Sequence, residues 1–184
     1  MNTQDFIIEL EMISLENQGE IVKEFGVLPY KNYLEVFTFT CCIALEVCKL
    51  IEDEVEQLTF KLMIYSFMVE KARDTYDFFK TKKRVLNTFI NARKQYYRRD
   101  ISEVLKSSST FNFDYTSFHF YSKDISFGFP VQEIFDDPLI EKYQPNPTFD
   151  QLMEKLTIKS YHSLVSYISY YVPTIRGNKG RLDD

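Results

Sequence analysis

A long stretch without glycine or proline is the feature that most limits how this chain can fold. No glycine or proline occurs between Pro29 and Gly128, although the chain has five glycines and six prolines in all. Inside a helix these residues cost about 1 and 3 kcal/mol respectively, whereas the turns of a sheet-rich domain commonly use them. The stretch therefore predicts a long block of helices.

Apolar residues spaced by three and four support this prediction, because that spacing places them on one face of a helix. Five stripes of this kind can be followed: Phe6, Leu10 and Ile13; Leu34, Phe37, Cys41, Ala44, Cys48 and Ile51; Val55, Leu58, Leu62, Tyr65, Val69, Ala72, Tyr76 and Phe79; Val85, Leu86, Phe89, Ile90, Tyr97, Ile101 and Leu105; and Leu152, Leu156, Leu164, Ile168 and Tyr171.

Helix boundaries follow from turn and capping residues. We expect Gly19 and Gly26 to close the first helix and its loop. The acidic run at 52–54 either forms a turn or lies within one long helix. Thr148 and Gln151 have the spacing of a capping box, which predicts that the last helix opens there.

A segment at about 111–129 departs from the helical pattern. Its aromatic residues alternate with polar ones, which is typical of a strand. We expect a short aromatic-rich hairpin or loop inserted into the bundle. Four of its side chains are candidate partner-binding residues: Phe113, Tyr115, Phe118 and Phe120. The alternative is that these rings cap the end of the core.

The predicted fold is all-α, a single-domain bundle of five to six helices over residues 1–175, with a disordered tail at 176–184. More than half of the residues should be helical, above the usual third. Seven residues are predicted to be buried: Leu58, Leu62, Val69, Leu86, Phe89, Leu156 and Leu164.

The sequence offers little that could carry catalysis or hold a metal. Cys41, Cys42 and Cys48 are an odd number of cysteines in one predicted helix, which favours reduced, buried thiols over disulfides. His119 and His162 have neither the paired spacing of a zinc site nor a nucleophile motif nearby. We therefore expect no metal, no cofactor and no enzymatic activity.

One segment is strongly basic. Residues 80–99 carry a charge of +8 without a single acid, whereas the rest of the chain carries −13. Six basic and amide side chains share a predicted helix face that could bind an anion or nucleic acid: Lys83, Arg84, Asn87, Asn91, Lys94 and Arg98. The alternatives are a solvated face that pairs with acids of the bundle, or a protein-docking face.

These observations favour a non-catalytic protein that binds and masks another protein, like an immunity protein, an antitoxin or an inhibitor. Its acidic surface would suit a basic partner. The second interpretation is a nucleic-acid-binding regulator that uses the basic segment, and an enzyme comes third. The first residues have no basic region followed by an apolar one, so we expect no signal peptide. The apolar run at 36–45 is too short to span a membrane. We expect a soluble, cytoplasmic protein, and the sequence leaves the oligomeric state open.

Overall fold

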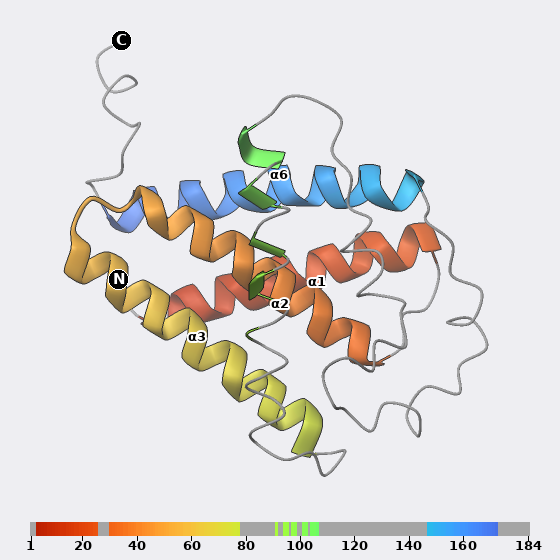
Figure 1. Ribbon diagram of the computed structural model, residues 1–184, viewed down its shortest axis with the longest axis horizontal. Coiled ribbons are helices and arrows are strands. Elements are labelled where there is room, and N and C mark those ends of the chain that lie inside the picture. Colours follow the sequence, from red (N-terminus) through yellow and green to blue (C-terminus); the bar gives the residue numbers. More distant parts are fainter. Residues whose placement is uncertain are drawn as a thin grey trace.

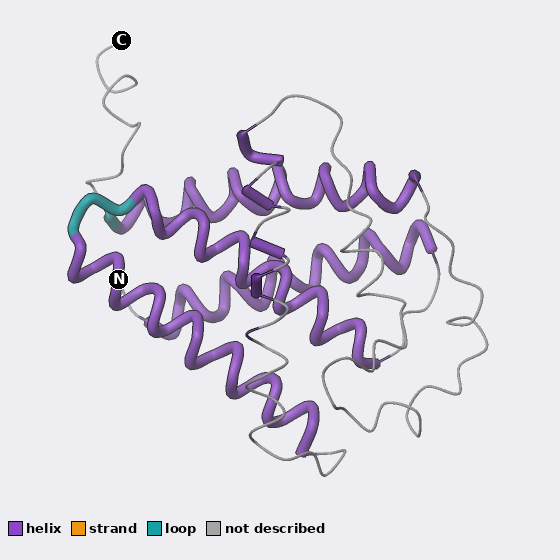
Figure 2. The backbone as a smooth tube through the Cα atoms, in the orientation of Figure 1, coloured by secondary structure: helices purple, strands orange, loops and turns teal. Residues whose placement is uncertain are grey.

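The computed structural model describes residues 3–25, 30–77 and 147–172, together with single positions between 91 and 106. These residues are 96% helical and include no strand, which confirms the all-α class. Figures 1 and 2 show the arrangement. The elements are α1 (Thr3–Phe25), α2 (Tyr30–Val47), the 3-10 turn η1 (Cys48–Leu50), α3 (Glu54–Asp77) and α6 (Pro147–Tyr171). The described positions at 91–106 are helical too, consistent with a bundle of five to six helices.

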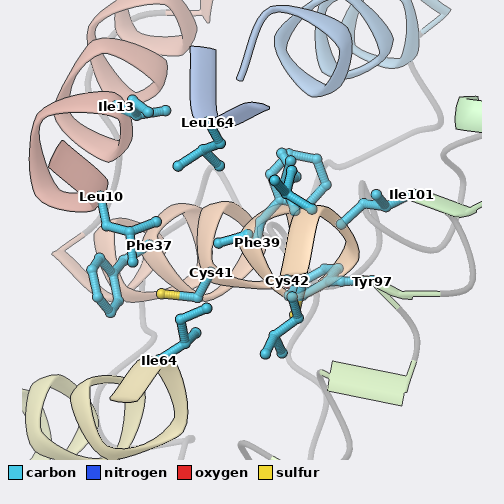
Figure 3. Close-up of a cluster of buried hydrophobic side chains, with 14 of the residues drawn as sticks. Leu10, Ile13, Phe37, Phe39, Cys41, Cys42, Ile64, Tyr97, Ile101 and Leu164 are labelled. Atoms are coloured by element: carbon cyan, nitrogen blue, oxygen red, sulfur yellow. The ribbon is translucent and has the colours of Figure 1, made fainter. Parts of the chain in front are cut away.

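Helix α2 lies at the centre of the bundle. Every residue from Leu34 to Cys48 is buried. Helices α1, α3 and α6 all contact it, and Figure 3 shows Tyr97 and Ile101 on the remaining side. A helix covered all round has to be apolar all round. This explains the apolar run at 36–45, and it means that the stripe predicted on α2 is one buried face among several.

A buried polar cluster joins α1 and α6 to the central helix. The Asn17 side-chain amide on α1 donates to Thr40 Oγ1 at 3.2 Å and to Ser160 Oγ at 3.0 Å. Burying an amide without hydrogen bonds would cost several kcal/mol. These bonds therefore fix which residues of α1, α2 and α6 lie opposite one another.

The helix ends differ in part from the sequence-based expectation. Helix α1 continues through Gly19, so the expectation that it closes there is wrong. The helix tolerates this exposed glycine because a single glycine inside a helix costs only about 1 kcal/mol. The run at 52–54 does contain a turn: Asp53 Oδ1 accepts the Glu56 backbone N–H at 2.7 Å and caps α3. Helix α6 begins at Pro147, so Thr148 lies just inside the helix.

The predicted core is right in part. Leu156 and Leu164 are buried, and Val69 is half-buried. Leu58 and Leu62 are 56% and 59% exposed, so their predicted burial is wrong. Leu86 and Phe89 lie outside the described residues.

The physical reason is that α3 has two apolar faces. The face that packs on α2 consists of Phe60, Ile64, Met68 and Ala72, all of them buried. Phe67 adds an edge-to-face contact with Phe37, with ring centroids 5.1 Å apart. Spacing by three and four identifies an apolar face but cannot show which of two such faces meets the core.

Two leucine substitutions test this assignment. Leu156→Ala should lower the free energy of unfolding by about 2–5 kcal/mol, because it leaves a cavity in the core. Leu62→Ala is the matched control and should change it by only about 0.5 kcal/mol, because its side chain is exposed. Urea unfolding measures both values. Equal losses would show that α3 turns its other face to the core.

Candidate functional site

Only half of the predicted anion-binding face can be located. Lys83, Arg84 and Asn87 lie outside the described residues. Asn91 is exposed, whereas Lys94 and Arg98 are half-buried. The structure therefore places three of the six side chains.

Lys94 and Arg98 both contact side chains of the bundle. The Lys94 ammonium lies over the Tyr65 ring of α3, 4.4 Å from its centroid, which is a cation–π geometry. Arg98 Nε donates to Glu46 Oε1 on α2 at 3.0 Å. These contacts correspond to the interpretation in which the basic segment pairs with groups of the bundle. Binding of nucleic acid by this face stays a prediction.

The partner of Arg98 belongs to a line of buried residues on one face of α2. Glu35, Phe39, Cys42 and Glu46 are spaced by four, three and four and are all buried. The Tyr97 hydroxyl donates to Glu35, and its ring meets Phe39 edge to face at 5.7 Å between centroids.

Sequence reasoning missed this line. Glu35 and Glu46 directly precede and follow the apolar run at 36–45. Their separation of 11 residues is about three helical turns, and that spacing was the available signal that both lie on one face.

The carboxylates of this line have hydrogen-bond or ion-pair partners, and its thiol is buried. Glu46 also pairs with Lys49, so two cations neutralise it. Burial raises the pKa of the Cys42 thiol well above its ordinary value, although the charges of Arg98 and Lys94 oppose this shift. A thiol that stays protonated is a poor nucleophile. The part of the chain that the structure describes contains no group of three potential metal ligands.

The described surface has an apolar patch that the sequence analysis did not single out. Ile8, Met12 and Leu15 are 53% to 63% exposed and lie on the side of α1 opposite Phe6 and Leu10. We call these three residues the outer α1 stripe. Acidic residues border it: Asp5, Glu9, Glu11 and Glu16.

A second exposed patch consists of Val55, Leu58 and Leu62, which we call the outer α3 stripe. Val55 is 76% exposed, the largest value of the three. Thr59 and Ser66 border this stripe on one side, and Glu54 and Lys61, which have opposite charges, border it on the other. The two stripes thus differ in the charge of their borders. The predicted partner-binding aromatics Phe113, Tyr115, Phe118 and Phe120 lie outside the described residues.

Comparisons with known proteins give no relative: no family model, no curated protein and no solved structure matches this chain. No helix in the described part of the chain is long and apolar enough to cross a membrane.

The Arg98–Glu46 pair gives a test of what the basic segment does. Arg98→Met should lower the free energy of unfolding by about 1–2 kcal/mol, because it leaves the Glu46 carboxylate buried without this partner. The expected loss is smaller than for a fully buried ion pair, because the Arg98 side chain is 34% exposed. The double variant with Glu46→Gln should lose less than the sum of the single losses. Additive losses in urea unfolding would contradict the pairing.

The buried thiols predict a loss of stability in alkali. Burial raises the pKa of Cys48 from 9.0 to about 12, so above pH 9 the folded chain holds a proton that the unfolded chain loses. The contribution of the protonated Cys48 thiol to the free energy of unfolding is complete below pH 9. It declines toward pH 12, by up to about 1.4 kcal/mol per pH unit.

The measurement is urea unfolding between pH 7 and 11, with Cys48→Ala as the control. The control should show a shallower decline with pH, because it lacks this titrating group. Tyr167, whose pKa burial also raises, titrates in both proteins and cancels from the comparison. Parallel pH profiles would contradict the prediction.

Proposed function

We propose that this chain is a non-catalytic, cytoplasmic binding protein that masks another protein, in the manner of an immunity protein, an antitoxin or an inhibitor. The observation that carries the proposal is the outer α1 stripe. It is a contiguous, exposed apolar surface on a helix whose opposite face is already committed to the core.

Packing among the described helices does not account for this stripe. Helix α1 buries Phe6, Leu10, Ile13 and Ile21 against its neighbours, and Asn17 fixes its position. A surface helix normally has polar residues on its other side. Clustered apolar side chains in that place are characteristic of an interaction site.

Charge supports a basic partner. Helix α1 carries six acidic residues and one lysine, a formal charge of −5 that equals the net charge of the whole chain. Complementary charge speeds encounter with a partner and disfavours wrong partners. A masking protein directed against a basic enzyme such as a nuclease fits this surface.

The second candidate is a nucleic-acid-binding regulator, favoured by the charge of +8 over residues 80–99. The contacts of Lys94 and Arg98 within the bundle weigh against it, because these side chains already have partners. The acidic remainder of the chain would also repel a polyanion.

Affinity purification from the native host separates the two candidates. The bait is the wild-type chain, compared with a variant in which Ile8, Met12 and Leu15 are all changed to Gln. A control variant has Val55, Leu58 and Leu62 changed to Gln. We expect the wild type and the control to retain one protein in stoichiometric amount after nuclease treatment, and the α1 variant to lose it. In a parallel sample without nuclease treatment, retention of nucleic acid alone, abolished by reversing the charge of Lys83 and Arg84, would support the regulator instead.

A further inference from the structure

We infer that the outer α1 stripe is a docking site for a basic amphipathic helix. The inference rests on the proposed function and names the chemistry of the partner. It is drawn from the spacing, the exposure and the bordering charges of the residues on α1.

The spacing suits a helix. Residues 8, 12 and 15 lie four and three apart, so the stripe extends for about 10 Å along α1. Gly19 continues the same face one turn further, and a Cβ placed on it would meet no atom within 4 Å. Its missing side chain leaves room for another backbone to approach closely. A partner helix with apolar residues at i, i+3 or i+4, and i+7 matches this shape.

The charges around the stripe select a basic partner. Asp5, Glu9 and Glu16 lie along one border, and Glu11 lies along the other. Glu16 pairs with Lys159 at 3.1 Å, and Glu11 pairs with Lys71. All four of these side chains are well exposed, and exposed ion pairs contribute little to stability. Lysines or arginines of a partner can therefore take over these carboxylates.

The acidity is strongest on α1, which carries −5. Helix α3 has five acidic and three basic residues, and α6 has two of each. The outer α3 stripe is therefore a matched surface: it is also apolar, but Glu54 and Lys61 on its border have opposite charges, so the border does not select for a basic partner.

The same border argues against a second copy of this chain as the partner. A two-fold dimer places the same patch of both copies face to face. The carboxylates along one α1 would then meet those along the other, which like-charge repulsion disfavours. A basic segment from a different protein meets no such repulsion.

The probe is a fluorescein-labelled peptide of about 18 residues, built from Leu and Lys in an amphipathic helical pattern. Binding is followed by fluorescence anisotropy at low salt. Replacing Ile8, Met12 and Leu15 by Gln should weaken binding at least about ten-fold, because apolar anchors carry most of the affinity. The variant with Val55, Leu58 and Leu62 changed to Gln should bind within about two-fold of wild type. Circular dichroism checks that both variants keep their helices.

Two further measurements test the charge. Affinity for the Leu–Lys peptide should fall as salt rises from about 50 to 500 mM, because screening shortens the reach of the carboxylates. A peptide with Glu in place of Lys should not bind. Equal weakening by the α1 and α3 variants, or equal binding of the two peptides, would overturn the inference.

The results also separate this inference from the proposed function. One outcome is that the α1 substitutions leave the affinity for the Leu–Lys peptide unchanged but abolish retention of the partner protein. The basic-helix inference then fails and the masking function stands. If neither depends on the α1 stripe, both fail.

Discussion

The complete burial of α2 is the constraint on which the rest of the structure depends. A helix with no exposed side from Leu34 to Cys48 needs neighbours all round, and α1, α3, α6 and the segment around Tyr97 supply them. Apolar contact with this helix contributes most to holding the bundle together, because burial stabilises in proportion to the apolar area removed from water.

Burial also obliges every polar group on α2 to find a partner. Thr40 accepts from Asn17 and donates to the Val36 carbonyl oxygen at 2.9 Å. Glu35 accepts from Tyr97, and Glu46 pairs with Arg98. Apolar packing alone is non-directional, so these bonds determine how α1, α6 and the 97–98 segment sit along α2. Arg98 of the basic segment is thereby held against α2.

The outer faces of the surrounding helices are then what remains for binding. Both α1 and α3 have a second apolar face, and the two differ in their borders. Carboxylates line the one on α1, whereas a carboxylate and an ammonium group, Glu54 and Lys61, lie beside the one on α3 and offset each other. On the proposed function, the charged border of the α1 face selects the partner while its apolar centre supplies the affinity.

The sequence by itself determined the helical class, because the stretch without glycine or proline and the three-four spacing are local properties of the chain. It also determined that the three thiols are buried on a helix, since Cys41, Cys42 and Cys48 share an apolar segment. Only the tertiary structure decided which face of α3 is inside. The buried face that begins at Phe60 and the exposed face that begins at Val55 both have helical spacing, and only packing against the other helices distinguishes them. The tertiary structure likewise paired Arg98 with a carboxylate 52 residues away and left Ile8, Met12 and Leu15 exposed. Contacts between distant residues depend on how helices meet in space, and helical periodicity within one segment carries no information about that.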